Sequence, residues 1–128
     1  MSSSVLDASA LLALINGEPG HQQVRAALLA EAAIGAVNLA EVVTKLVDAG
    51  MVEMVIRQAL APLRLEVVQF DAELAYRTGL LRRLTRQAGL SLGDRACLAL
   101  AQYLALPVLT ADRAWQGLQL GVAIQVIR

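Results

Sequence analysis

The stretch Val5-Leu6-Asp7-Ala8-Ser9-Ala10-Leu11-Leu12 places an acidic residue between two apolar segments. The segment before it, residues 3–6, has the pattern of a short strand, and residues 8–15 have that of an apolar helix. Both segments are suited to the protein interior, where an unpaired charge is costly. The stretch therefore predicts a strand and helix joined by a turn whose carboxylate requires a partner.

Strand-like and helical segments alternate along the rest of the chain. Strands are predicted at residues 34–37, 65–70, 107–110 and 122–127, and helices at 22–30, 39–49, 52–60, 71–87 and 94–104. Such alternation is typical of a mostly parallel sheet that helices cover on both faces. We expect one α/β domain over residues 1–128, without repeats or linkers.

Three further acidic residues occupy related places. Glu41 and Asp112 come after predicted strands, and Asp94 opens a helix that can be aimed at the same edge of the sheet. In an open α/β domain the carboxyl ends of the strands meet at one crevice. Carboxylates gathered there repel one another unless a cation joins them. The joint placement of these residues with Asp7 predicts a metal site.

Each acidic residue also has a structural explanation. Asp7 and Asp112 can each cap the helix that follows. Two pairs have the three-residue spacing of a capping box, namely Asn38 with Glu41 and Ser91 with Asp94. Taken singly, each residue is better explained by capping, so the metal site depends on all four together.

Composition excludes several classes of protein. A hydrophobic fraction of 57% excludes disorder, and a net charge of zero argues against a general positive field for nucleic acid. With one cysteine, Cys97, and one histidine, His21, neither a disulfide nor a multi-histidine zinc site can form within one chain. No basic start or long apolar run suggests a secretory signal or membrane span, so we expect a cytoplasmic protein.

Four segments together resemble the PIN-domain ribonuclease family, in particular its VapC-like toxin branch. They are Val5-Leu6-Asp7-Ala8-Ser9, Asn38-Leu39-Ala40-Glu41-Val42, Ser91-Leu92-Gly93-Asp94-Arg95-Ala96 and Leu109-Thr110-Ala111-Asp112-Arg113-Ala114-Trp115. Their order and spacing match, and the resemblance covers essentially the whole chain. It implies a PIN-like three-layer α/β/α sandwich with a mostly parallel central sheet.

The resemblance also implies an active site. Its catalytic, metal-holding residues would be Asp7, Glu41, Asp94 and Asp112, around one or two Mg²⁺ or Mn²⁺ ions. The supporting polar groups would be Ser9, Asn38 and Thr110. These ions prefer carboxylate and water oxygens, and they make water acidic enough to attack a phosphodiester without a histidine base. The implied activity is an endoribonuclease whose products carry 5′-phosphate and 3′-hydroxyl ends.

Arginine residues are candidates for RNA contacts. Arg82, Arg83 and Arg86 share one side of a predicted helix and could contact phosphates beside the pocket, although a solvated helix face explains them too. Arg95 and Arg113 each follow a proposed ligand directly, which suits either the substrate path or a supporting ion pair. Only 3% of the residues are aromatic, too few for a base-stacking platform.

The segment from Leu39 to Leu60 carries more apolar residues than one helix face needs. Core packing is the default explanation. The resemblance adds a homodimer and an antitoxin protein, whose tail would lie in an apolar groove and could direct an arginine at the acidic pocket. Apolar grooves that contain methionine suit such partners.

Other classes of protein compete with this interpretation. A receiver-type signalling domain needs paired acids after the first strand and a lysine after the last, whereas Asp7 stands alone and Lys45 is the only lysine. A phosphatase that uses two aspartates flanking one residue would need Asp where Ser9 stands. A non-catalytic PIN-like binding module and a housekeeping RNA-processing nuclease without an antitoxin are the remaining alternatives.

Overall fold

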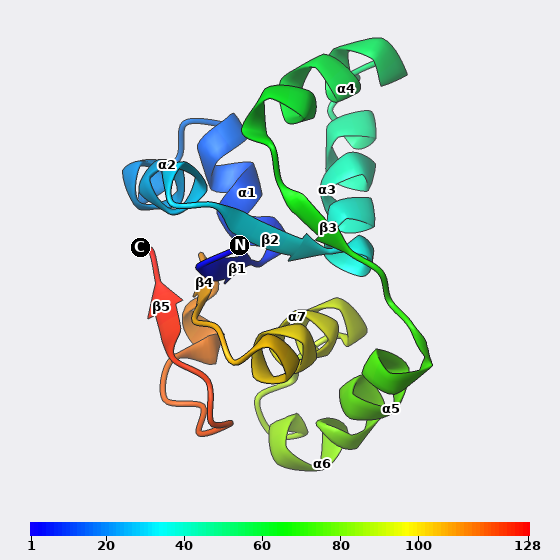
Figure 1. Cartoon of the computed structure of the whole chain (residues 1–128), viewed down its shortest axis with the longest axis vertical. Coiled ribbons are helices and arrows are strands. Elements are labelled where there is room, and N and C mark those ends of the chain that lie inside the picture. Colours follow the sequence, from blue (N-terminus) through cyan, green and yellow to red (C-terminus); the bar gives the residue numbers. More distant parts are fainter.

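A parallel sheet forms the middle layer of the computed structural model, which describes residues 1–128 (Figure 1). Its strands run in the spatial order β3-β2-β1-β4-β5, and every neighbouring pair is parallel. All strands therefore end at the same edge. The strands are β1 (Ser4–Leu6), β2 (Ala32–Gly35), β3 (Glu66–Val68), β4 (Val108–Thr110) and β5 (Ile124–Val126).

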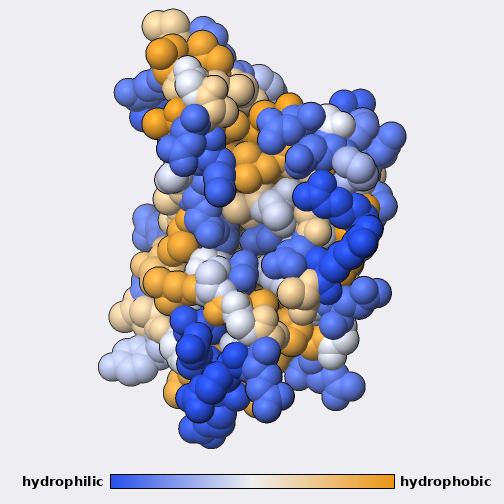
Figure 2. Space-filling view, turned by 180° about the vertical axis from the view of Figure 1, so that it is seen from behind, coloured by the Kyte–Doolittle hydropathy of each residue, from blue (hydrophilic) through white to orange (hydrophobic).

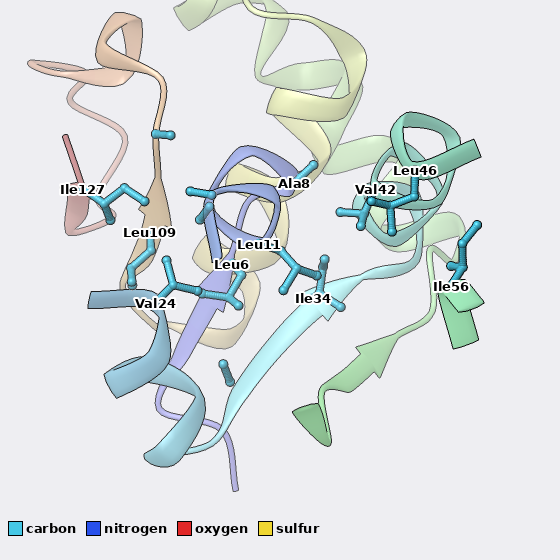
Figure 3. Close-up of a cluster of buried hydrophobic side chains, with 14 residues drawn as sticks. Leu6, Ala8, Leu11, Val24, Ile34, Val42, Leu46, Ile56, Leu109 and Ile127 are labelled. Carbon is cyan, nitrogen blue, oxygen red and sulfur yellow. The ribbon is translucent and has the colours of Figure 1, made fainter. Parts of the chain in front are cut away.

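Helices from the first half of the chain cover one face of this sheet. They are α1 (Ala8–Ile15), α2 (His21–Leu29), α3 (Ala36–Asp48) and α4 (Glu53–Leu60), which continues into the short turn η1 (Ala61–Leu63). Figure 3 shows the buried cluster on this face, in which Leu11 of α1 lies beside Leu6 and Ile34 of the sheet. Val42 and Leu46 extend the cluster along α3.

Helices from the second half cover the other face. They are α5 (Ala72–Leu80), α6 (Arg82–Thr85) and α7 (Leu92–Leu104), with the short turn η2 (Arg113–Trp115) after β4. Val5, Val108, Leu98 and the fully buried Trp115 form the core there. Successive strand residues point to opposite faces, so Val5 packs in this layer and Leu6 in the other. The predicted three-layer α/β/α sandwich is confirmed.

Two predicted elements exist but begin two or three residues earlier in the chain. The strand predicted at 34–37 lies at Ala32–Gly35, and the next helix begins at Ala36 instead of residue 39. Ala32 and Ala33 are good helix formers by propensity, but they sit in the sheet interior between β1 and β3, where small buried side chains fit. Tertiary packing here overrides local propensity.

The long helix predicted at 71–87 is wrong, because the structure divides it into α5 and α6 at Leu81. Leu81 itself keeps a right-handed helical backbone and is buried among the core residues of this layer. The other elements lie within a few residues of their predicted positions, and α1 lies at the predicted residues 8–15. No helix combines the length and the apolar character needed to cross a membrane.

Replacing Leu11 by Ala tests the packing between α1 and the sheet. Leu11 is fully buried, so the substitution should leave a cavity and lower the free energy of unfolding by about 2–5 kcal/mol. Urea unfolding monitored by circular dichroism measures this loss. The exposed Leu29 of α2 provides the control, because Leu29→Ala should change the stability by less than about 0.5 kcal/mol.

Candidate active site

Asp7 lies at the centre of a hydrogen-bond network where β1 and β4 end. Its Oδ2 accepts hydrogen bonds from the hydroxyls of Ser9 (2.7 Å) and Thr110 (2.9 Å). The backbone N–H of Ala111 donates to the Ser9 hydroxyl, and that of Asp112 donates to the Thr110 hydroxyl, at 2.9 and 3.0 Å. Asp7 is 4% exposed. The two turns after β1 and β4 therefore hold one buried carboxylate between them.

A second polar group lies where α3 meets the start of α7. The amide of Asn38 donates to Oε1 of Glu41 (2.8 Å) and to the carbonyl of Gly93 (3.0 Å), and Asn38 is fully buried. Ser91 and Asp94 form a capping box, in which each side chain accepts from the other residue's backbone N–H. Glu41 and Asp94 are each half-buried. This group presents two carboxylates from two different helices.

Electrostatic coupling joins the two groups. The pKa of Asp7 is raised to about 6, chiefly by burial and in smaller part by the charges of Asp94 and Glu41, against the hydrogen bonds from Ser9 and Thr110, which lower it. Burial and the same three carboxylates hold the pKa of the fully buried Cys97 thiol well above its usual range. The structure thus brings Glu41 and Asp94 close enough for their charges to act on Asp7.

The fourth acid, Asp112, serves as a helix cap. Its Oδ1 accepts from the backbone N–H of Ala114 (2.9 Å), as the capping explanation predicts. Its charge is not among those that shift the pKa of Asp7, and its link to the site runs through its own backbone N–H and Thr110. The structure therefore places Asp112 beside the acidic group without the coupling that joins the other three.

The structure contains some of the helix caps predicted for the acidic residues and lacks others. The capping box at Ser91 and Asp94 is confirmed, whereas the one at Asn38 and Glu41 is wrong, because Gly35 is the N-cap of α3 and Asn38 lies inside the helix. Asp7 precedes α1 but makes no side-chain cap bond. Asp7 and Glu41 are therefore turned toward the site instead of toward their own helix ends.

The predicted arginines lie outside this hydrogen-bond network. Arg82, Arg83 and Arg86 are exposed on or just after α6. Arg95 donates from Nη1 to the carbonyl of Thr78 on α5 (3.0 Å), and Arg113 donates from Nε to the carbonyl of Arg128 (3.2 Å). Neither makes an ion pair, so their contacts here join α5 to α7 and η2 to the end of the chain.

The donor set fits a hard divalent cation. No three acidic, cysteine or histidine side chains stand close enough together to enclose an ion. Mg²⁺, however, is usually bound through one or two carboxylates and keeps several water ligands. A cation would also offset the repulsion that Asp94 and Glu41 impose on Asp7. The residues therefore suit a site in which water completes the coordination.

Comparison with known proteins agrees with this architecture. The family model described as the PIN domain matches residues 4–119, so the chain belongs to the PIN domain family. A sequence comparison with curated proteins finds no match. The resemblance drawn from the four segments is thereby confirmed.

Several solved structures with this fold are of toxin–antitoxin proteins. A toxin–antitoxin complex from Klebsiella pneumoniae is 25% identical, with a TM-score of 0.74 over 94% of this chain and 96% of that chain. VapBC-5 from Mycobacterium tuberculosis is 25% identical, with a TM-score of 0.59 over 98% of each chain. VapBC2 from Rickettsia felis, bound to a promoter DNA fragment, is 18% identical, with a TM-score of 0.73 over 95% and 96%, and shows the shared fold.

The raised pKa of Asp7 predicts a dependence of stability on pH. An ordinary Asp in the unfolded chain has a pKa near 3.9. Between roughly pH 4 and pH 6 the folded protein keeps a proton that the unfolded chain releases, so stability should fall as pH rises through this window and stay lower above it. Asp7→Asn should remove most of this fall and raise the free energy of unfolding at pH 7 by about 1–3 kcal/mol.

Urea unfolding at pH 4 and pH 7 in EDTA measures this difference. Asp48→Asn is the matched control, since Asp48 is exposed at the last residue of α3. An Asp7→Asn protein with the same pH dependence as the unmodified protein would show that the site does not hold Asp7 as described.

Proposed function

We propose that this protein is a metal-dependent endoribonuclease and the toxin of a toxin–antitoxin pair. The observation that supports it most is the convergence of Asp7, Glu41 and Asp94 from β1, α3 and α7 in a chain of the PIN domain family. Such a carboxylate group can hold Mg²⁺ or Mn²⁺. Membership of the family supports nuclease chemistry, and the similarity to toxin–antitoxin structures supports the biological role.

The carboxylates of Asp7, Glu41 and Asp94 would hold one or two ions, and Asp112 would complete the acidic surface beside them. A bound divalent cation supplies positive charge at the reacting phosphate and makes water more acidic. Ser9 and Thr110 keep Asp7 in place by donating to one of its oxygens, which leaves Oδ1 free of protein hydrogen bonds. Asn38 performs the same task for Glu41.

Neither the histidine nor the cysteine of the chain is a better candidate than a metal-bound water for the general-base role in phosphodiester cleavage. The one histidine, His21, is at the start of α2, and the one cysteine, Cys97, is a fully buried thiol whose pKa is raised first by burial and then by the nearby carboxylates. Metal-assisted attack by water is the phosphodiester chemistry that remains open to this set of residues. The expected products carry 5′-phosphate and 3′-hydroxyl ends.

The antitoxin would bind the apolar surface around α3 and α4. A groove of about 660 Å³ runs between α3, α4 and β3, and Leu39, Val43 and Ile56 contribute to its lining. Beside it, Val52 and Met54 are 64% and 69% exposed, and Figure 2 shows apolar side chains gathered at the end of the molecule that α4 forms. An amphipathic partner segment or a second copy of the chain in a homodimer would cover such a surface.

An RNA cleavage assay tests the catalytic proposal. The purified protein, free of antitoxin, should cut end-labelled RNA at discrete sites with Mg²⁺ or Mn²⁺, and EDTA should abolish the cuts. Asp7→Asn or Asp94→Asn should lower the rate by about 100-fold or more, because the charge that holds the cation is lost. Asp48→Asn is the control and should cleave at the unmodified rate.

Two outcomes would contradict the proposal. Full activity in both the Asp7→Asn and the Asp94→Asn protein would remove the acidic site from the reaction. Absence of cleavage with either ion, in a protein that still binds RNA, would favour a non-catalytic binding module. A neighbouring small antitoxin-like reading frame would separate a toxin from a housekeeping nuclease.

The arginines around α6 should contribute RNA affinity through phosphate contacts. A triple Arg82→Gln, Arg83→Gln, Arg86→Gln variant in an Asp7→Asn background should bind RNA more weakly, and its log Kd should depend less steeply on log salt, by up to about 2 in slope. Fluorescence anisotropy at several salt concentrations measures both quantities. A triple variant of the exposed Arg25, Arg57 and Arg64 provides the charge-matched control, and equal effects of the two triple variants would contradict a specific role for α6.

A further inference from the structure

Gly93 stands out among the glycines because a functional side chain occupies the space where its own would be. A Cβ added at Gly93 would lie 2.6 Å from both the carboxyl carbon and Oε1 of Glu41, and closer still to Oε2. These are the three nearest atoms, and all belong to that one carboxylate. The φ angle of Gly93 is outside the left-handed region, so its backbone would accept any residue. The closest obstacle to a side chain at this position is therefore the Glu41 carboxylate.

A buried side chain holds this close approach in place. The amide nitrogen of Asn38 donates at once to Oε1 of Glu41 (2.8 Å) and to the carbonyl of Gly93 (3.0 Å). Asn38 is fully buried, and its bond to the Gly93 carbonyl is shielded from bulk water, whereas the Glu41 carboxylate that it also holds is half-buried. The carboxylate of Glu41 is therefore pressed against the first turn of α7, one residue before Asp94.

Glycine destabilises a helix relative to alanine, so a glycine at position 93 calls for an explanation. Gly93 lies in the first turn of α7, where alanine would favour the helix by a smaller loss of backbone entropy. Gly79, the other glycine inside a helix, has no neighbouring atom within 4 Å of the place where a Cβ would lie, so it shows what alanine does without a steric conflict. The two positions form a natural pair for comparison.

We propose that Gly93 is a positioning residue of the active site. Its missing side chain makes the space in which the Glu41 carboxylate lies, and this sets the separation between Glu41 on α3 and Asp94 on α7. The consequence for metal binding rests on the function proposed above, whereas the steric relation between Gly93 and Glu41 does not. Any side chain at this position would push Glu41 away from its place beside Asp94.

Thermal unfolding in EDTA tests the steric relation without metal. Gly93→Ala should lower the melting temperature of the protein, because the new methyl group meets the Glu41 carboxylate. In a Glu41→Ala background the same substitution should leave the melting temperature unchanged or raise it, since only the gain in helix propensity remains. Gly79→Ala should raise it slightly or not at all in both backgrounds. A loss that is the same with and without the Glu41 side chain would overturn the proposal.

Metal affinity and cleavage test the consequence for the site. Gly93→Ala should weaken Mn²⁺ binding, measured by calorimetry, on the order of 10-fold to 100-fold, with a parallel loss of RNA cleavage. Gly79→Ala should match the unmodified protein in both. Adding Glu41→Asp to Gly93→Ala should recover part of the Mn²⁺ affinity, because the shorter side chain leaves room for the methyl group.

The two measurements can contradict the positioning role of Gly93 and the proposed function independently of each other. Mn²⁺ affinity in Gly93→Ala equal to that of the unmodified protein would overturn the positioning role. An unmodified protein that binds no Mn²⁺ would contradict the proposed function, while the unfolding experiment would still decide whether Gly93 makes space for Glu41.

Discussion

The buried carboxylate of Asp7 at the end of β1 is the constraint around which the site is arranged. An ionised group with 4% exposure is costly, and burial raises its pKa to about 6. Hydroxyls of Ser9 and Thr110 offset part of this cost, which requires that β1 and β4 be neighbours and end at the same level. Parallel pairing in the centre of the sheet meets this requirement. The fold thereby accepts a local loss of stability at neutral pH at the position where the proposed chemistry needs a charge.

The second half of the site depends on the close meeting of α3 and α7. These helices cover opposite faces of the sheet, yet their first turns converge at its carboxyl edge through Asn38, Glu41 and Gly93. The buried amide of Asn38 links the Glu41 carboxylate of one layer to the first turn of α7 in the other. The capping box of Ser91 and Asp94 fixes the start of α7 at the same time. Asp94 thus combines structural capping with its place in the proposed site.

The apolar surface follows from the same architecture. Because α3 must begin at the site, its far end and α4 extend beyond the sheet, and the exposed Met54 and Val55 lie there. Figure 1 shows α4 at the end of the molecule, away from α5 and α6. The surface that we propose for the antitoxin and the surface that we propose for RNA are consequently on different elements. The proposed cleavage of RNA and the proposed binding of the antitoxin would therefore use separate surfaces.

The sequence by itself determined the layered α/β architecture and the candidate acids, because the periodicity of apolar residues and the amino-acid composition are local properties. The run from Val5 to Leu12 predicts β1 and α1 directly, and the spacing of Ser91 and Asp94 predicts the cap of α7. Tertiary structure decided the register of β2, since Ala32 and Ala33 acquire a strand conformation only between β1 and β3. It also decided which acids interact, for Asp112 turns to cap η2 while Glu41 turns inward. The role of Gly93 is invisible in the sequence because it depends on a side chain that is 52 residues away in the chain and in contact only after folding.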